Sequence, residues 1–216
     1  MKINSLIKKE AARQKRVINL IPSENYVSKD VLAALSSPLT NKYAEGYSHK
    51  RYYFGNKVID EVEDEVKNLV YRAFKISSKE WDVNVQPYSG SIANLAVYLG
   101  ILELGDRILA MSLEHGGHLS HGHLVSLTGK LFKFRHYGVG HDGFIDYEEV
   151  ARIAKKFKPT LIVCGASAYP RKIDFGKFRK IANSIGALLM ADIAHIAGLI
   201  VGGVHSSPFP YADIVT

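Results

Sequence analysis

The segment "ALLMADIAHIAG", residues 187–198, places a carboxylate where its pattern calls for another apolar side chain. Asp192 ends an apolar run, and His195 and Gly198 follow closely. A lone carboxylate that leaves water loses several kcal/mol of solvation, even after the protein relaxes around it. Asp192 therefore needs a compensating partner, and the nature of that partner points to the chemistry of the protein.

Two other apolar segments also lead into polar residues. In "NVQPYSGSIAN", Ser89, Gly90 and Ser91 lie at a turn into a helix, where free N–H groups and the helix dipole attract anions such as phosphate. Taken alone, this turn is better explained by an ordinary helix N-cap at Ser89 or Ser91. It is not a Walker loop, because no Gly-Lys-Ser/Thr sequence follows. The segment "TLIVCGAS" ends with the hydroxyl of Ser167.

The segment "EHGGHLSHGH" contains four histidines, His115, His118, His121 and His123. Their spacing matches no familiar zinc pattern, and no cysteine accompanies them, so we expect no metal site. Two explanations remain. The histidines are polar residues of a loop and helix start, or one imidazole stacks on a flat ligand while the glycines make room for it.

A flat cofactor with a phosphate at one end and a ring nitrogen at the other would use all of these groups. Pyridoxal 5'-phosphate is such a molecule. A carboxylate beside its pyridine nitrogen keeps that nitrogen protonated, which makes the ring an electron sink. The positive ring would in turn offset the burial of Asp192. The alternative is structural: Asp192 caps a helix or forms a salt bridge, and His195 is a hydrogen-bonded core histidine.

These residues can act together only if the fold brings them to one edge of a sheet. Short apolar segments alternate with amphipathic ones, which predicts an α/β fold with a mostly parallel sheet and helices on both faces. Such sheets bind ligands at the carboxyl ends of their strands. The expected helices span residues 57–74, 91–104, 146–157 and 174–186, and the expected strands span residues 81–87, 107–113, 160–167, 187–192 and 211–216.

Several local signals refine these helices. Asp146 is placed to cap one of them, and Gly186 is placed to close another. Residues 91–104 are apolar almost all round, so we expect that helix to be buried on both sides. Residues 1–16 are basic and loosely amphipathic, which favours a surface helix.

The composition limits the class of protein. The chain has 216 residues, of which 47% are hydrophobic, enough for one or two domains. Its one cysteine, Cys164, cannot form an internal disulfide, which favours a reducing compartment such as the cytoplasm. No apolar stretch is long enough to span a bilayer, and the N-terminus lacks the apolar core of a secretory signal, so we expect no membrane partner.

The net charge of +7 comes from lysines and arginines spread along the chain. Their densest cluster, "ARIAKKFK", lies on an expected helix, where such a run is usually a solvated face. Anionic small molecules suit this charge equally well, and we do not expect nucleic acid as a partner.

The sequence resembles serine hydroxymethyltransferase, a fold-type-I pyridoxal phosphate enzyme. Six motifs in order carry the resemblance over residues 17–216: "LIPSENYVS", "LTNKYAEGY", "KRYY", "NVQPYSGSIAN", "LEHGGHLSHG" and "MADIAHIAGL". The family transfers a hydroxymethyl group between serine and a tetrahydropterin, giving glycine and the methylene derivative. The resemblance implies a cytoplasmic transferase of one-carbon metabolism and of glycine and amino-acid biosynthesis, acting as a homodimer with a shared active site.

The resemblance also implies residue roles. The cofactor-binding residues would be Tyr43, Ser89, Gly90, Ser91, His118, Ser167, Asp192 and His195. The substrate-binding residues would be Ser23, Glu45, Tyr53, Leu113, Gly117, His118 and Leu119. The catalytic residues would be Glu45, Tyr53, His118 and His195.

Within this set, His118 would stack on the ring, Ser167 would bond the ring hydroxyl, and Asp192 would pair with the ring nitrogen. Tyr43 and Tyr53 would serve the cofactor of the partner subunit. Glu45 is the best acid–base candidate, because a carboxyl in an enclosed site can be raised toward neutrality. Its alternative is a surface carboxylate in a turn.

The sequence departs from the family pattern at two motifs. Phe54 and Asn56 change the segment after the paired tyrosines, and "IPSEN" replaces the commoner Ile-Ala-Ser-Glu-Asn. These changes leave two co-substrates open, tetrahydrofolate or a modified tetrahydropterin.

The chain also stops at Thr216, before the family's Schiff-base lysine. We expect an N-terminal helical arm over residues 1–45, an incomplete cofactor-binding large domain over residues 46–216, and no C-terminal small domain. This predicts a fragment that is inactive alone. Two other possibilities are another fold-type-I pyridoxal phosphate enzyme and a non-catalytic half-domain retained for binding or oligomerisation.

Overall fold

The computed structural model describes residues 2–216, and the chain divides into two compact units between Ser37 and Pro38. The first unit contains two helices, α1 (Lys2–Gln14) and α2 (Lys29–Leu35). Neither helix buries a side chain, so the predicted surface helix at the N-terminus is confirmed. The Ser28 hydroxyl accepts the N–H of Val31 and thereby begins α2.

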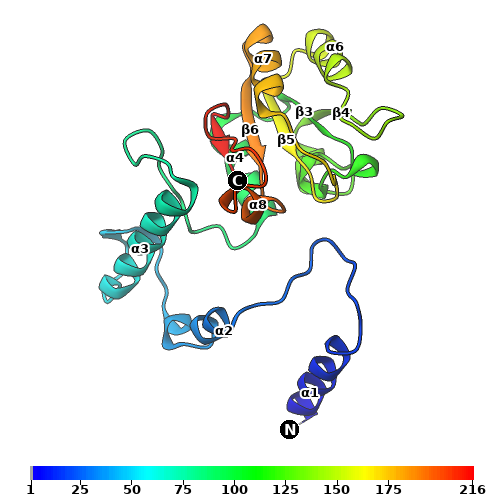
Figure 1. The fold of residues 1–216 in the computed structure, drawn as a ribbon. Coiled ribbons are helices and arrows are strands. Elements are labelled where there is room, and N and C mark those ends of the chain that lie inside the picture. The colour runs from blue at the N-terminus through cyan, green and yellow to red at the C-terminus, as the bar shows by residue number, and fades with distance from the viewer. Residues whose placement is uncertain (1) are drawn as a thin grey trace. The chain divides into compact units, whose positions relative to one another are not determined.

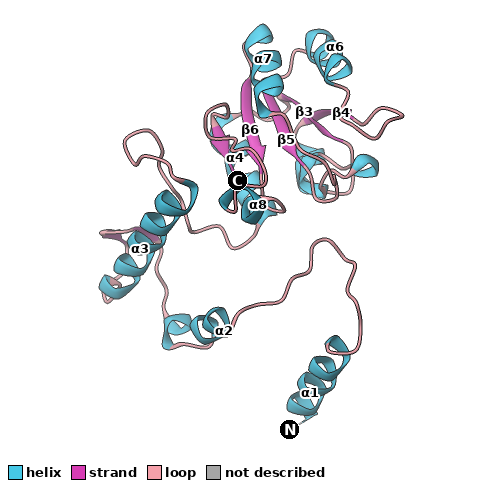
Figure 2. Cartoon of the chain, viewed as in Figure 1, coloured by secondary structure: helices cyan, strands magenta, loops and turns pink. Residues whose placement is uncertain are grey.

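The second unit carries all the other elements, coloured by type in Figure 2. Its α-helices are α3 (Lys57–Phe74), α4 (Gly90–Ile101), α5 (Leu127–Leu131), α6 (Tyr147–Phe157), α7 (Phe175–Ile185) and α8 (Ala197–Val201). Its short 3-10 helices are η1 (Pro38–Asn41), η2 (Leu113–His115) and η3 (Leu119–His121). Its strands are β1 (Gly46–Tyr47), β2 (Lys50–Arg51), β3 (Arg107–Met111), β4 (Lys133–Tyr137), β5 (Leu161–Gly165), β6 (Leu188–Asp192) and β7 (Ile214–Val215).

Five strands form one parallel sheet in the order β4-β3-β5-β6-β7 (Figure 1). Because all five run the same way, their carboxyl ends meet at one edge of the sheet. The register places Gly165, at the end of β5, beside Asp192, at the end of β6. The loop after β5 therefore begins next to the carboxylate that the sequence singled out.

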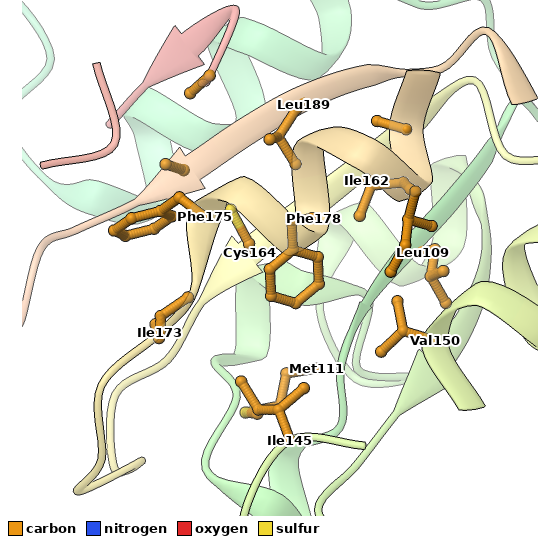
Figure 3. Packing of buried hydrophobic residues seen from close by; sticks show 14 of the residues in the cluster. Leu109, Met111, Ile145, Val150, Ile162, Cys164, Ile173, Phe175, Phe178 and Leu189 are labelled. Atoms are coloured by element: carbon orange, nitrogen blue, oxygen red, sulfur yellow. The ribbon is translucent and has the colours of Figure 1, made fainter. Parts of the chain in front are cut away.

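Helices cover both faces of the sheet. Alternate residues of each strand point to opposite sides, so each strand contributes to two hydrophobic cores. Ile108 and Ala110 of β3 pack with Tyr98 of α4 on one face. Leu109 and Met111 belong to the core on the other face, which α6 and α7 cover. Figure 3 shows Phe178 of α7 lying over the aliphatic side chains of this second core. The predicted α/β fold, with a parallel sheet and helices on both faces, is confirmed.

The predicted caps are confirmed as well. Asp146 accepts the N–H groups of Glu148 and Glu149 at 3.1 and 3.0 Å and begins α6. Gly186 ends α7 with a φ of +69°, a conformation that glycine adopts without strain.

Two predictions are wrong: the strand at residues 81–87, and the burial of the helix over residues 91–104 on both of its sides. Residues 81–87 form an extended loop and no strand. Side chains compete for their backbone: the Asp82 carboxylate accepts the N–H of Val83, and Asn84 Oδ1 accepts the N–H of Gln86. Helix α4 is buried on one side only.

The exposed side of α4 carries Leu99, which is 53% exposed, and Ile101, which is 42% exposed. Apolar character all round a helix does not by itself decide what covers it.

Candidate functional site

Asp192 ends β6 and is 9% exposed. Its Oδ2 atom lies 2.9 Å from Asn94 Nδ2 and 2.9 Å from His121 Nε2, and its Oδ1 atom accepts the N–H of Ala194 at 3.1 Å. Burial works to raise the pKa of Asp192, but the hydrogen bonds from these donors outweigh it and leave the pKa below its ordinary value. The chain therefore keeps this buried carboxylate ionised.

These contacts change the explanation of how Asp192 is compensated. The sequence-based interpretation assigned the compensation to a cofactor ring, and its structural alternative had Asp192 cap a helix or form a salt bridge and made His195 a core histidine. The structure has the salt bridge of that alternative, with His121, but does not have a core histidine at His195. In the structure, His121 and Asn94 contact the carboxylate, whereas His195 lies exposed in the turn after β6. Sequence reasoning missed both contact residues.

Asn94 reaches Asp192 because α4 begins beside the carboxyl edge of the sheet. The Ser89 side chain accepts the N–H of Ile92 at 3.4 Å, so the predicted capping role of Ser89 is confirmed. Ser89, Gly90 and Ser91 are all exposed. A Cβ atom on Gly90 would meet no atom within 4 Å, so the packing of the described chain does not itself demand glycine there.

A pocket of about 650 Å³ opens beside this turn. Ser89 and Gly90 line it together with Tyr88 and Thr216. Asp192 is not part of its lining. Asn94 links the two places instead, since its Oδ1 atom accepts the hydroxyl of Thr216 at 2.8 Å while its Nδ2 atom binds the carboxylate.

The histidine segment folds into the short helix η3. His118 is its N-cap, and Nδ1 of that ring accepts the N–H of Ser120 at 3.1 Å. Nδ1 of His121 accepts the N–H of His118 at 3.3 Å. The capping explanation of this segment therefore holds for two of the four histidines. Among residues 2–216, no group of three or more His, Cys, Asp or Glu side chains is arranged to hold a metal ion.

His118 is half-buried, and the electrostatics of the site act on it. Burial lowers the pKa of His118 below its ordinary value of 6.5. A positive charge on His121 or on His195 would act in the same direction, and the charge of Asp192 acts against it. The His118 side chain is thus biased toward its neutral form.

Ser167 lies in the loop after β5, close to the histidine segment. Its N–H donates to the carbonyl of Gly116 at 2.7 Å. Gly116 permits this approach: its φ is +104°, and a Cβ there would lie 2.9 Å from the backbone of Ala168. The Oγ atom of Ser167 is buried and has no hydrogen-bond partner among the described residues. A buried hydroxyl without a partner is costly, and a ligand atom would satisfy it.

Leu113, Gly117 and Leu119 surround the same histidine segment. Leu113 and His118 line a pocket of about 340 Å³. Gly117 is buried, and a Cβ there would lie 2.3 Å from the carbonyl oxygen of Met111, so only glycine fits. Leu119 is 44% exposed.

Tyr43, Glu45 and Tyr53 form a separate group in the same unit. The two tyrosine rings meet edge to face with centroids 5.4 Å apart, and the Tyr43 hydroxyl donates to the Glu45 carboxylate at 3.3 Å. All three side chains are exposed. Among residues 2–216, no hydrogen bond, ion pair or ring contact joins this group to Asp192.

A buried arginine that sequence reasoning missed supports this group. The Arg51 side chain is 4% exposed and pairs with Asp60 at 2.7 Å and Glu63 at 2.8 Å. It also donates to the carbonyl oxygens of Ala44 and Gly46, on either side of Glu45. The planar guanidinium group has five N–H donors, so it can bind several carboxylate and carbonyl oxygens at once.

Ser23 belongs to the first unit, where it is exposed. It lines a pocket of about 510 Å³ with Glu10, Arg13 and Tyr26.

Within residues 2–216, no helix combines the length and apolar character needed to cross a membrane.

The arrangement fits the donor set that pyridoxal 5'-phosphate needs. Three groups lie where β6, β5 and β3 end. They are the ionised carboxylate of Asp192, the buried hydroxyl of Ser167, which has no partner among the described residues, and the imidazole of His118, which is biased toward its neutral form. The exposed N-terminus of α4, with open space at Gly90, offers N–H groups for a phosphate.

Comparisons with known proteins point to one family. The family model described as serine hydroxymethyltransferase matches residues 1–216. Three similar proteins carry the name serine hydroxymethyltransferase: one from Methanosarcina barkeri, 59% identical over 97% of this chain and 50% of the relative; one from Desulfotalea psychrophila, 56% identical over 99% and 49%; and one from Metamycoplasma arthritidis, 51% identical over 99% and 50%. The chain thus spans about half the length of these relatives.

Proposed function

The chain belongs to the serine hydroxymethyltransferase family, and from this premise we propose that it forms the cofactor-binding part of a pyridoxal phosphate-dependent transferase. The reaction is transfer of a hydroxymethyl group between serine and a tetrahydropterin, with glycine as the other product. One observation carries the proposal above the rest. Asp192 is a buried carboxylate held ionised at the carboxyl edge of a parallel sheet, and the loop after the neighbouring strand carries a buried hydroxyl, that of Ser167, which has no partner among the described residues.

Each cofactor contact would fall to a residue whose own hydrogen bonds leave that capacity free. Asp192 would bind the ring nitrogen, and Ser167 would bond the ring hydroxyl through Oγ. His118 would lie on the face of the ring, with His195 near its reactive end. The cofactor, when bound, supplies an electron sink for the amino acid. The phosphate would lie at the start of α4, on Ser89, Gly90 and Ser91.

The group of Tyr43, Glu45 and Tyr53 supports a site shared between two copies of the chain. Its side chains are exposed to solvent, while Arg51 fixes the backbone on either side of Glu45. We assign Tyr43 and Tyr53 to the partner's cofactor. Glu45 and Tyr53 would also face the amino acid, with Glu45 as the group that holds or moves the proton of the serine hydroxyl.

The tetrahydropterin would bind beside Leu113, Gly117, His118 and Leu119. Support comes from a pocket of about 340 Å³ that Leu113 and His118 line. Either tetrahydrofolate or a modified tetrahydropterin suits this proposal. Ser23 completes the substrate set. The single buried thiol of Cys164 supports a cytoplasmic location, because a reducing compartment keeps it free.

Binding of pyridoxal 5'-phosphate tests the proposal. We expect saturable binding, followed by the absorbance of the cofactor. Ser167→Ala should weaken binding about tenfold, since it removes one hydrogen bond to a buried partner. The control Ser184→Ala removes the hydroxyl of an exposed residue, which donates to the Ile181 carbonyl at 2.7 Å, and this variant should bind the cofactor normally. Equal affinity of both variants would reject this cofactor site.

A further inference from the structure

Both imidazoles of the η3 turn accept a backbone N–H through Nδ1. The N–H of Ser120 points at Nδ1 of His118, and the N–H of His118 points at Nδ1 of His121. A ring nitrogen that accepts a hydrogen bond must keep its lone pair, so neither Nδ1 atom carries a proton. The proton of each neutral ring is then on Nε2, where His121 donates to Asp192.

The Ser120 side chain adds a second donor to His118. Its Oγ atom lies 2.7 Å from Nδ1 of His118 and 2.8 Å from Nδ2 of Asn94. An amide nitrogen only donates, so Asn94 fills a lone pair of the hydroxyl, and the hydroxyl proton is left for His118.

The orientation of Asn94 is fixed by its other two contacts. Its Nδ2 atom faces the carboxylate of Asp192, which accepts, and its Oδ1 atom faces the hydroxyl of Thr216, which donates. Asn94 is 1% exposed and Ser120 is 4% exposed, so water does not compete for either side chain.

We propose that Ser120 is a positioning residue that holds His118 as the neutral tautomer with its proton on Nε2, and that Asn94 orients the Ser120 hydroxyl for this task. Protonation of Nδ1 would set the new ring N–H against the N–H of Ser120, so the backbone hydrogen bond is lost. It would also reverse the bond to Ser120 Oγ, which would then accept, and the buried hydroxyl proton would lose its acceptor. The turn is therefore a tautomer lock, made of one backbone and one side-chain donor.

The role of this neutral tautomer in cofactor binding rests on the proposed function. A neutral imidazole lies against a positively charged ring without charge repulsion, whereas an imidazolium does not. Asn94 contacts Asp192 and Ser120 together, so one side chain sets both the carboxylate for the ring nitrogen and the imidazole for the ring face.

Other titratable groups face His118 and must be considered in any titration. His121 lies in the same turn, Asp192 ends β6, and His195 follows β6; Glu114, His123 and His136 line the adjoining pocket.

Nitrogen NMR of the cofactor-free protein, labelled with ¹⁵N-histidine, tests the lock. His118→Gln identifies the His118 signals. In the unmodified protein, we expect a pyridine-like Nδ1 and a pyrrole-like Nε2 at neutral pH. Ser120→Ala should raise the proton affinity of His118 about tenfold, the effect of one lost hydrogen bond. Ser120→Thr, which keeps the hydroxyl, should restore the original titration, and Ser184→Ala should not change it.

Two results would overturn the proposal. One is a proton on Nδ1 of His118 in the unmodified protein at neutral pH, a measurement that needs no variant to fold. The other is a Ser120→Ala protein whose His118 titrates as before. Binding of pyridoxal 5'-phosphate is measured separately by absorbance, so a protein with the Nε2 tautomer that binds no cofactor would reject the proposed function alone.

Discussion

Asp192 and His118 both make the folded state less stable in acid, in different pH ranges. The pKa of Asp192 lies below its ordinary 3.8, so its contribution is complete above that value and is lost as the pH falls further. The pKa of His118 lies below 6.5, so the unfolded chain binds that proton first and stability declines as the pH drops below 6.5.

His118→Gln should remove the second effect and retain the first. We expect its free energy of unfolding to vary less than that of the unmodified protein between about pH 7 and pH 5, because a neutral side chain replaces the titrating one. Urea unfolding at a series of pH values measures this. His141→Gln changes an exposed histidine and serves as the control. Identical pH dependence in all three proteins would contradict the role assigned to His118.

Among the elements, the β1–β2 hairpin and the start of α3 depend on one buried side chain. Arg51 neutralises Asp60 and Glu63, whose side chains are 10% and 17% exposed. Arg51→Met would remove the guanidinium from two largely buried carboxylates. The contacts that remain are weak, since His49 Nδ1 lies 3.9 Å from Asp60 and Gln86 Nε2 lies 3.4 Å from Glu63. We expect a loss of about 3–5 kcal/mol in the free energy of unfolding.

Arg72→Met is the matched control for that change. Arg72 pairs with Glu65 on α3, but both side chains are more than half exposed, at 66% and 57%. Its loss should cost less than about 1 kcal/mol. Chemical denaturation compares the two variants, and an equally small effect of Arg51→Met would refute the buried junction.

At the scale of the whole molecule, a site shared between two copies makes a specific prediction. Asp192→Asn damages the cofactor site, and Glu45→Gln damages the group offered to the partner. Mixed dimers would combine both changes in one site and leave the other intact. With both changes made in the complete enzyme, we expect inactive single-variant preparations to regain about one quarter of the activity when unfolded together and refolded at equal amounts. No recovery would contradict the shared site.

The sequence predicted β3, β5, β6 and β7 because each lies in a short apolar run, and it predicted α6 and α7 because each carries its own caps. It missed β4, whose residues are mostly polar and exposed. Asp146 and Gly186 are local signals of this kind, and the structure uses them as expected. Residues 81–87 misled because their alternation of Val83 and Val85 suits a strand, while pairing depends on a partner segment that local pattern does not specify.

The partners of Asp192 could not be predicted from the local sequence either, because they are distant from it along the chain. Asn94 lies 98 residues away in the sequence and His121 lies 71 away. One signal was present: Asn94 is a polar residue within an otherwise apolar helix, which indicates a buried hydrogen bond. The exposed position of His195 and the junction at Arg51 had no such signal.

The protonation state of the bound cofactor tests the central claim most directly, namely that Asp192 exists to hold a protonated ring nitrogen. The measurement is the ¹⁵N chemical shift of the ring nitrogen of labelled pyridoxal 5'-phosphate bound to the protein near pH 8. We predict a protonated nitrogen in the unmodified protein and an unprotonated one in Asp192→Asn, because the amide carries no charge to stabilise the pyridinium. An unprotonated nitrogen in the unmodified protein, or the same protonated shift in both proteins, would contradict the account.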